Sequence, residues 1–375
     1  MSQNTTSSRY GDAYGRWAGL GPYYAMFPVQ FAREVIDGFC KKDGGVIDPF
    51  CGRGTVPFVA QATNRQSIGI DSNPVAWVFA RAKTDTCRNK NGIIERVHEI
   101  HQLSKKRDSE AKNEFQKWAW SPPALRFLNS ARIHLDWQNN QIDRTLMGFI
   151  LAGAHARKGD GISNQMQKSR AMGPHYSVRW WKERKMKPPK VDPVEHFTNR
   201  IKWRYRHGTI NRENPATLYL GKAETKLSQI KKREFDLLFT SPPYYNITSY
   251  LHDSWIRLWL LGEGKSIPDW QRDRNIHGMI AYKEMMHKVF VRSKKMLKDN
   301  ATVWVRTDAR KFTQETTKEV LLENWGDKCL YHRTDIPNKT QTEHFGRYMA
   351  RTGEVDFLVC RSPKKAKKWG FVRVH

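Results

Sequence analysis

Apolar positions in the first 84 residues alternate between helical spacing and short continuous runs. Helical spacing predicts helices over 30–39, 56–63 and 74–83, and apolar runs predict strands at 46–50 and 67–71. Strands that alternate with helices in this way pair in parallel, with the helices packed on the sheet. The opening segment therefore predicts an α/β domain.

The same alternation returns near residue 216. It predicts strands at 217–220, 235–240, 301–307 and 353–360, and helices at 254–261, 283–297 and 318–324. Between the two α/β stretches, helical spacing occurs at 95–106, 123–135 and 141–156, whereas 158–190 is polar, basic and interrupted by Gly and Pro. The predicted fold is a Rossmann-like α/β sheet, mostly parallel, that carries a helical basic insertion.

Four segments follow from this pattern. We expect 1–84 and 216–361 to form the two parts of the α/β domain, and 85–215 to form the insertion. The last segment, 362–375, contains no acid, and we expect it to fray or to lie on a partner.

Charge is concentrated in the insertion. The 375 residues include 65 Lys plus Arg against 37 Asp plus Glu, a formal charge of +28. Between residues 151 and 212, fifteen basic residues stand against four acids. Solubility alone would explain a basic surface, but self-repulsion on this scale favours a polyanionic partner. DNA or RNA is a better candidate than an acidic membrane surface.

Other protein classes find little support in the sequence. The longest apolar run, 146–154, is about half of the 18 to 20 residues that a membrane span needs, and residues 1–17 lack the apolar core of a signal peptide. The five cysteines lie far apart, and no His or Cys spacing matches a metal site. We expect a cytoplasmic protein with reduced thiols and no metal.

A glycine loop follows the first predicted strand. The segment 46–55 reads VIDPFCGRGT, and Gly52 and Gly54 allow close approach of a ligand to the backbone at the start of the next helix. Asp71 ends the second strand, where an acid accepts hydrogen bonds from ribose hydroxyls. The P-loop pattern is absent, and Pro57 stands where GxGxxG needs a small residue. The arrangement predicts a nucleoside cofactor rather than a dinucleotide.

A second loop, Ser241-Pro-Pro-Tyr-Tyr245, follows the predicted strand 235–240. Two prolines fix the backbone and remove two N–H donors, so its carbonyls are available to a ligand. Ser241 Oγ and the Pro242 carbonyl could accept from a planar amine while Tyr244 stacks on its ring. The tripeptide Ser121-Pro-Pro123 has neither a preceding apolar strand nor a following aromatic residue, and we interpret it as structural.

Together, the two loops resemble those of S-adenosylmethionine-dependent DNA methyltransferases that act on exocyclic amines. The matching motifs are Asp48-Pro-Phe-Cys-Gly-Arg-Gly-Thr55 and Ser241-Pro-Pro-Tyr244, with the glycine loop first. Segments 68–74 and 24–28 are similar to the family's second strand and to the stretch that lines the methionine end of the cofactor. In 218–224, Lys222 stands where the family often has an acid, and Glu224 is the substitute candidate for the adenine contact.

The resemblance implies two sets of site residues. The catalytic set is Ser241, Pro242, Pro243 and Tyr244. The cofactor set is Phe27, Pro28, Asp48, Pro49, Phe50, Cys51, Gly52, Gly54, Thr55, Asp71, Ser72, Asn73, Glu224 and Ser241.

The implied reaction is direct methyl transfer from S-adenosylmethionine to the exocyclic amine of a base flipped out of double-stranded DNA. Ser in the first position of the loop favours cytosine N4. Adenine N6, an RNA base amine and an inactive DNA-binding module are the alternatives, in that order. Cytosine C5 chemistry needs a Cys after Pro, and no cysteine here follows a proline.

The implied DNA contacts lie in the basic insertion and beside the catalytic loop: Arg179, Trp180, Lys182, Arg184, Lys185, Lys187 and Tyr245. A cognate restriction endonuclease is a further candidate partner. We expect the protein to lie in the cytoplasm, associated with the nucleoid.

Overall fold

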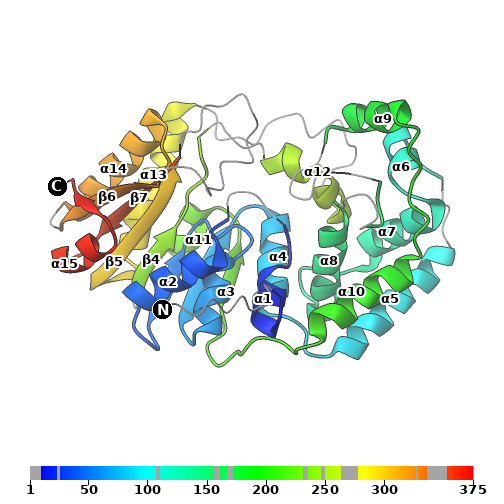
Figure 1. Ribbon diagram of the computed structural model, residues 1–375, viewed down its shortest axis with the longest axis horizontal. Coiled ribbons are helices and arrows are strands. Elements are labelled where there is room, and N and C mark those ends of the chain that lie inside the picture. Colours follow the sequence, from blue (N-terminus) through cyan, green and yellow to red (C-terminus); the bar gives the residue numbers. More distant parts are fainter. Residues whose placement is uncertain are drawn as a thin grey trace, which may run out of the picture. The chain divides into compact units, whose positions relative to one another are not determined.

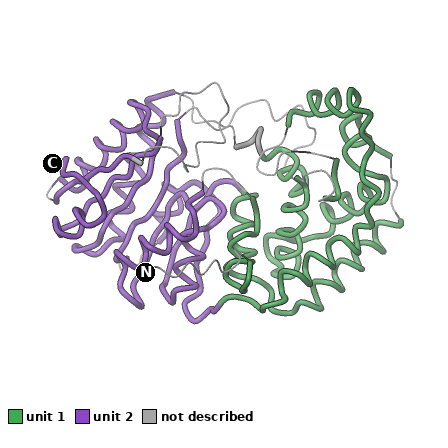
Figure 2. The backbone as a smooth tube through the Cα atoms, viewed as in Figure 1, with its two compact units in different colours: residues 1–24, 74–210, 250–273 green, residues 25–73, 211–249, 274–375 purple. Residues whose placement is uncertain are grey.

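The computed structural model describes residues 10–22, 26–106, 110–155, 161–164, 166, 172–230, 235–245, 250–262, 278–326, 328–335 and 353–374. The chain forms two compact units, each built from three separate stretches of sequence (Figure 2). Unit 1 comprises Met1–Tyr24, Pro74–Ile210 and Tyr250–Asp273, and unit 2 comprises Ala25–Asn73, Asn211–Ser249 and Arg274–His375.

Unit 2 contains an eight-stranded sheet in the order β3-β2-β1-β4-β5-β7-β6-β8 (Figure 1). Its strands are β1 (Gly45–Asp48), β2 (Gln66–Asp71), β3 (Thr217–Leu220), β4 (Phe235–Thr240), β5 (Leu297–Asp308), β6 (Leu330–Asp335), β7 (Glu354–Val359) and β8 (Val372–Arg373). The first five strands in this order pair in parallel, and β7, β6 and β8 pair antiparallel. The predicted α/β fold with a mostly parallel sheet is confirmed.

Helices cover both faces of this sheet. They are α2 (Val29–Phe39), α3 (Thr55–Ala62), α11 (Ala223–Gln229), α13 (Met279–Lys294), α14 (Lys311–Trp325) and α15 (Pro363–Lys368). Because side chains alternate along a strand, Leu238 and Val303 pack in one core cluster with Phe290 of α13. Phe239 and Trp304 point to the other face, where their rings lie 6.2 Å apart.

Unit 1 is helical in the part of it that the structure describes, apart from one isolated bridge between Trp120 and Ser163. Its helices are α1 (Ala13–Ala18), α4 (Pro74–Thr84), α5 (Lys90–Lys105), α6 (Glu114–Ala119), α7 (Pro122–His134), α8 (Gln141–Gly153), α9 (Pro174–Glu183), α10 (Pro193–Tyr205) and α12 (Tyr250–Leu260). Fully buried aromatic side chains, among them Trp17, Phe127 and Trp181, form its core. The helices α1, α4 and α12 lie outside the expected insertion 85–215, so unit 1 has wider boundaries than the sequence pattern indicates.

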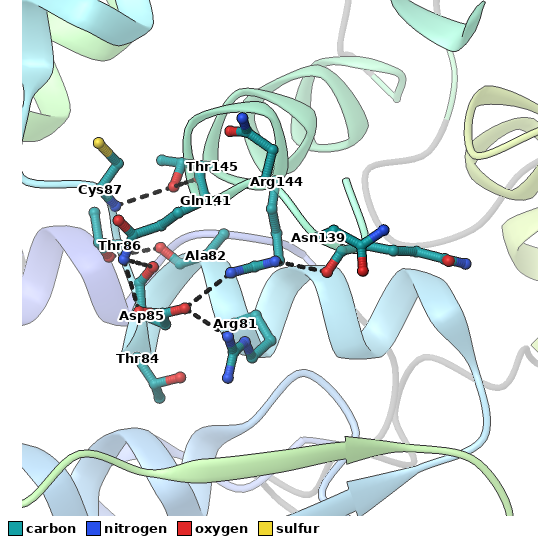
Figure 3. Close-up of polar contacts among 12 residues, drawn as sticks. Arg81, Ala82, Thr84, Asp85, Thr86, Cys87, Asn139, Gln141, Arg144 and Thr145 are labelled. Carbon is teal, nitrogen blue, oxygen red and sulfur yellow. Dashed lines mark hydrogen bonds and ion pairs between the residues drawn. The ribbon is translucent and has the colours of Figure 1, made fainter. Parts of the chain in front are cut away.

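A polar junction at the end of α4 explains why this helix packs with α8 (Figure 3). Asp85 Oδ2 accepts from Arg81 Nη2 at 2.6 Å and from Arg144 Nη2 at 2.9 Å, while Asp85 Oδ1 accepts from Gln141 Nε2 at 2.7 Å. One carboxylate therefore binds groups from both helices. Periodicity alone does not reveal this pairing, because α4 has the same spacing as a helix that covers a sheet.

Two regions contain regular elements that the apolar pattern did not indicate. Helix α9 lies within the polar region 158–190 and buries Val178 and Trp181, and helix α10 follows that region and buries Phe197 and Ile201. Each helix has Pro in its first turn. The terminal segment, which we expected to fray or to lie on a partner, does not fray. It forms α15 and β8, with β8 paired to β6.

The order of the terminal segment comes from aromatic packing. The ring of Phe371 lies 5.0 Å from that of Trp304, and the ring of Trp369 lies 5.5 Å from it. Such packing between distant positions leaves no periodic signal in a segment of this length. Within the described residues, no helix combines the length and apolarity that a membrane crossing requires.

Candidate active site

The glycine loop connects β1 to α3 in unit 2. Gly52 and Gly54 adopt positive φ values of 51° and 76°, which residues with a Cβ rarely take. Gly54 is the N-cap of α3, and its N–H donates to the Cys51 carbonyl at 2.8 Å. The tight turn brings the N–H groups of the first turn of α3 to the carboxyl end of β1, as the sequence predicted.

Asp71 fixes this loop to the end of β2. Its Oδ2 accepts from the Gly52 N–H at 2.8 Å, and its Oδ1 accepts from the Asn73 N–H at 2.8 Å. Burial raises the pKa of Asp71 to about 6, and the two backbone N–H donors oppose that rise. Each oxygen can accept a further bond. Asp71 is therefore a structural brace of the loop that keeps acceptor capacity for a sugar hydroxyl.

Asp48 joins the glycine loop to the strand that precedes the second loop. Its side chain is buried, and its Oδ1 accepts from Thr240 Oγ1 at 2.6 Å and from the Phe50 N–H at 3.1 Å. Burial raises the pKa of Asp48 to about 7, against these hydrogen bonds. Because β1 and β4 are parallel neighbours, the two loops leave the same edge of the sheet.

The second loop is irregular from Ser241 to Tyr244 and begins directly after β4. Ser241, Pro243 and Tyr245 are half-buried, and Pro242 and Tyr244 are buried. The other Ser-Pro-Pro sequence forms the start of α7, with Ser121 as N-cap. Residues 121–123 therefore have a structural role at the start of a helix, whereas residues 241–244 form an irregular loop after a strand.

Tyr244 departs from the expected stacking geometry. Its side chain is 5% exposed, and its hydroxyl donates to Glu354 Oε1 at 3.1 Å. Burial and the negative charge of Glu354 raise the pKa of Tyr244, while a hydrogen bond with the Ser241 side chain lowers it. The phenol is therefore held inside unit 2 rather than presented as an open ring face.

The loop is also held at its far end. The guanidinium of Arg310 donates from Nη2 to the Tyr245 carbonyl, and Asp308 Oδ1 accepts from Arg310 Nε at 3.0 Å. The Tyr245 ring packs 4.9 Å from Phe312. Sequence patterns missed Thr240, Glu354 and Arg310 as site residues. For Glu354, the sequence offers one signal, an acid within a segment predicted to be a strand. The structure shows that all six residues of this strand are buried.

The remaining candidate cofactor residues also belong to unit 2. Phe27 is buried and stacks on Phe239 at 4.4 Å, and Pro28 caps α2. Ser72 is exposed beside half-buried Asn73, and half-buried Glu224 lies in the first turn of α11. Of the resembling stretch 24–28, Tyr24 and Ala25 lie outside the described residues.

The loop fits a nucleoside ligand that carries a polar tail. Thr55 is the first residue of α3 and is 4% exposed, and its hydroxyl has no hydrogen-bond partner within the described residues. A buried hydroxyl is costly without a partner. Together with the Gly54 turn, it forms a position where a ligand carboxylate or hydroxyl would complete the hydrogen bonding.

The basic candidates in unit 1 lie on α9 and the segment after it. Arg179, Lys182, Arg184, Lys185 and Lys187 are exposed. Lys182 Nζ contacts Glu114 Oε1 at 2.9 Å, and the Arg184 guanidinium lies 3.2 Å from the centroid of the half-buried Trp180 ring. Exposed ion pairs of this kind are weak, so they exchange readily for phosphate contacts.

Some aromatic residues of the basic insertion have a structural role. Trp181 is fully buried, and Tyr205 packs edge-on at 5.0 Å from Trp17. Tyr176, which the sequence did not single out, is 45% exposed and lies 6.0 Å from the Trp180 ring. The basic residues Arg157, Lys158, Lys168 and Arg170 lie outside the described residues.

Sequence comparisons match the first part of the chain, which contains the glycine loop. Residues 2–81 match the model of a family described as DNA methylase, N6_N4_Mtase. Two similar proteins are the Type II methyltransferases M.XycI of Xanthomonas campestris pv. cyanopsidis, 34% identical over 77 residues, and M.Cfr9I of Citrobacter freundii, 43% identical over 54 residues. These matches cover 20% and 14% of this chain, and the chain spans only 25% and 18% of those proteins.

Solved structures with a similar chain path include a TehB-like SAM-dependent methyltransferase from Corynebacterium glutamicum and the rRNA methyltransferase aviRa from Streptomyces viridochromogenes. The first has 7% identity and a TM-score of 0.30, covering 88% of this chain and 87% of that one. The second has 13% identity and a TM-score of 0.35, covering 94% and 96%.

The sheet order and the glycine loop define a mostly parallel α/β protein. Its first 81 residues, which contain the glycine loop, are similar to the DNA methylase family and to parts of two Type II methyltransferases.

Proposed function

We propose that the protein transfers a methyl group from S-adenosylmethionine to the exocyclic amine of a base in DNA. The observation that carries the proposal is the hydrogen bond from Thr240 Oγ1 to Asp48 Oδ1, which links the strand ends that precede the two loops. It keeps the cofactor loop and the Ser-Pro-Pro-Tyr loop together at one edge of the sheet. Holding two reactants in a productive geometry is a large part of catalysis in such a transfer.

The cofactor half of the site follows the predicted residue set. The N–H groups at the Gly52–Gly54 turn and the Thr55 hydroxyl would hold the polar tail, and Asp71 would accept from the ribose hydroxyls. Phe27 and Pro28 would lie near the methionine end, with Pro49, Phe50 and Cys51 shaping the loop, Ser72 and Asn73 beside the ribose, and Glu224 near the adenine. Bound S-adenosylmethionine supplies an electrophilic methyl group on its sulfonium.

The substrate half of the site would consist of hydrogen-bond acceptors for the target amine. The target amine would donate its two hydrogens to Ser241 Oγ and to the Pro242 carbonyl, which turns the nitrogen lone pair toward the methyl group. In this position the amine nitrogen would be the nucleophile toward the methyl group that the sulfonium supplies; S-adenosylhomocysteine would be the leaving group, and the proton that the amine loses would pass to water. Pro243 keeps this part of the loop without an N–H donor, and its rigidity limits the reorganisation during the reaction.

We propose cytosine N4 as the acceptor, because Ser rather than an acid occupies position 241. Adenine N6 is the second candidate, followed by an RNA base amine and an inactive DNA-binding module. The exposed basic residues of α9 support double-stranded DNA as the partner. Recognition of a defined site, base flipping and a cognate restriction endonuclease complete the proposal.

The test is transfer of labelled methyl from S-adenosylmethionine to duplex DNA and, separately, to tRNA, followed by nucleoside analysis. Label in N4-methylcytosine supports the proposal in full, and label in N6-methyladenine replaces the acceptor base. Label only in the tRNA changes the substrate class. Label in 5-methylcytosine, or in no nucleoside, overturns the proposed activity.

A further inference from the structure

Helix α9 carries two aromatic rings and a guanidinium in a row along one of its sides. Tyr176, Trp180 and Arg184 are spaced four residues apart, so they follow one another along the same side of the helix. The Tyr176 and Trp180 rings lie 6.0 Å apart with an interplanar angle of 31°. The Arg184 guanidinium lies 3.2 Å from the centroid of the Trp180 ring. We call these three residues the aromatic strip.

The aromatic strip is separate from the part of α9 that packs in the core of unit 1. The helix buries Ser177, Val178 and Trp181, which lie on a different side of it. Tyr176 is 45% exposed, whereas Trp181 is fully buried. Packing inside unit 1 therefore does not account for the alignment of an exposed tyrosine ring with Trp180.

The chain around the aromatic strip is strongly basic. From 174 to 190, six basic residues stand against one acid, Glu183, and all six are exposed. The Arg179 guanidinium lies 5.7 Å from the centroid of the Tyr176 ring, and Arg184 Nη1 lies 3.3 Å from Glu183 Oε2 in an exposed, weak ion pair. A guanidinium that lies over a ring keeps N–H donors at its edge for phosphate. Rings and phosphate-binding groups therefore alternate along this side of α9.

Single-stranded DNA fits this combination better than other polyanions do. In a duplex the bases are stacked on one another, so a duplex offers phosphates to the cations but few base faces to the rings. An acidic membrane surface takes up exposed aliphatic side chains, whereas α9 keeps Val178 buried. An unpaired base exposes its faces, and aromatic side chains stack on them with little dependence on sequence.

We propose that α9 binds unpaired bases of single-stranded DNA. The bases stack on Tyr176 and Trp180, and the adjacent guanidinium groups hold the phosphates. This inference rests on the proposed function, in which base flipping opens the duplex and leaves bases unpaired. It goes beyond that function because it gives α9 a ligand other than the double helix. Binding to the strip needs no methyl transfer, so the two are tested separately.

The test combines two variants of Tyr176 with two strands. Tyr176→Leu removes the ring and keeps an apolar side chain, whereas Tyr176→Phe keeps the ring. One strand is a labelled oligothymidylate of about 12 nucleotides, and the other has the same length but consists of abasic sites, so it offers phosphates without bases. Fluorescence anisotropy of each labelled strand measures its affinity for the full chain.

The ring and the bases should depend on each other. We expect Tyr176→Leu to bind oligothymidylate about 5- to 150-fold more weakly than wild type, and Tyr176→Phe to stay within about twofold of wild type. All three proteins should bind the abasic strand equally. The salt dependence should not change, because neither substitution alters the charge. Tyr10→Leu is the matched control, since Tyr10 is 39% exposed in the same unit, and it should bind both strands as wild type does.

Three results would overturn the inference. The first is a loss in Tyr176→Leu that is the same for both strands, and the second is an equal loss in Tyr10→Leu. The third is weaker binding of Tyr176→Leu to vesicles of anionic phospholipid with unchanged affinity for oligothymidylate, which would make the ligand a membrane surface. Failure of the proposed function looks different: wild type then transfers no methyl group, while the dependence of oligothymidylate binding on the Tyr176 ring persists.

Discussion

The Thr240 hydroxyl donates a hydrogen bond from Oγ1 to Asp48 Oδ1 at 2.6 Å. This bond joins the carboxyl ends of two neighbouring parallel strands, β4 and β1. Asp48 is 2% exposed, and burial raises its pKa from the ordinary value of 3.8 to about 7. The native protein therefore keeps a proton on Asp48 at a pH where the unfolded chain has lost it. Stability must depend on pH through this residue.

Asp48→Asn should remove that dependence. Between about pH 4 and pH 7 the native state binds one more proton than the unfolded chain, so the contribution of Asp48 to stability falls as pH rises. At about 1.4 kcal/mol per pKa unit, the fall reaches up to about 4 kcal/mol by pH 8. Denaturant titrations at several pH values should show the Asp48→Asn variant gaining stability relative to wild type as pH increases.

The amide of that variant adds a buried N–H donor, and its cost of about 1–3 kcal/mol does not change with pH. The informative quantity is therefore the pH slope of the difference in unfolding free energy. Thr240→Val is the matched control: it removes the hydroxyl donor but leaves the buried carboxyl, so its own free energy of unfolding should still fall as pH rises from 4 to 7, as that of wild type does. A pH-independent difference between wild type and Asp48→Asn contradicts the raised pKa.

Gly54→Val should abolish cofactor binding. Gly54 has φ 76° at the start of α3, so a β-branched side chain strains the backbone of the loop directly before Thr55. Gly370→Val is a close control, because Gly370 has φ 75° and a Cβ there would meet nothing within 4 Å. Both variants should lose roughly 1–2 kcal/mol of stability from the strained backbone.

Calorimetric titration with S-adenosylmethionine distinguishes the two positions. Affinity should be lost in Gly54→Val and retained in Gly370→Val. Equal affinities in these two variants would place the cofactor away from the glycine loop.

Local signals explain why the two loops could be predicted from the sequence. The glycine loop lies between a strand and a helix that are continuous in sequence, and Asp71 ends the next strand along the chain. The Ser241 loop is likewise defined by the apolar strand directly before it. In each case the residues that determine the geometry are neighbours in the sequence.

The partners of these loops could not be predicted in the same way. Glu354 and Arg310 contact Tyr244 and Tyr245 from separate strands and turns, and nothing near the loop in sequence indicates them. The same holds for α4, whose place in unit 1 depends on Asp85 and Arg144. Contacts between distant segments follow from the tertiary fold. Periodicity predicts the class of that fold but not which side chains meet in it.

Ser241→Ala should separate chemistry from cofactor binding. In the proposed reaction the Ser241 side chain would accept from the amine, whereas hydrogen bonds to Asp71 and Asp48 fix the glycine loop. We expect kcat to fall by at least about 100-fold. Cofactor affinity should stay close to that of wild type in the same titration. A parallel loss of affinity would mean that Ser241 belongs mainly to the cofactor pocket.

Charge reversal on α9 should weaken DNA binding and its salt dependence. Arg179 and Arg184 are exposed, and each phosphate contact contributes about 0.9 to the slope of log affinity against log salt. The double variant Arg179→Glu with Arg184→Glu should therefore reduce the slope by about 2. Lys288→Glu with Lys318→Glu changes the net charge equally on exposed positions of α13 and α14 and should leave the slope intact. Equal effects of the two pairs would indicate long-range charge rather than contacts on α9.

Asp356→Asn should produce the opposite pH behaviour from Asp48→Asn. Burial favours the neutral acid, but the bonds and charges of Arg306 and Arg333 outweigh burial and lower the pKa of Asp356. Its carboxylate therefore stabilises the native state above about pH 4, and this contribution is lost as pH falls through the lowered pKa. Removing one partner of a buried ion pair costs about 3–5 kcal/mol, so the variant should be less stable by this amount at pH 7. The deficit should shrink on acidification, whereas the difference for Asp48→Asn should grow as the pH rises from 4 to 7. A deficit for Asp356→Asn that persists undiminished in acid would show that packing, not ion pairing, accounts for it.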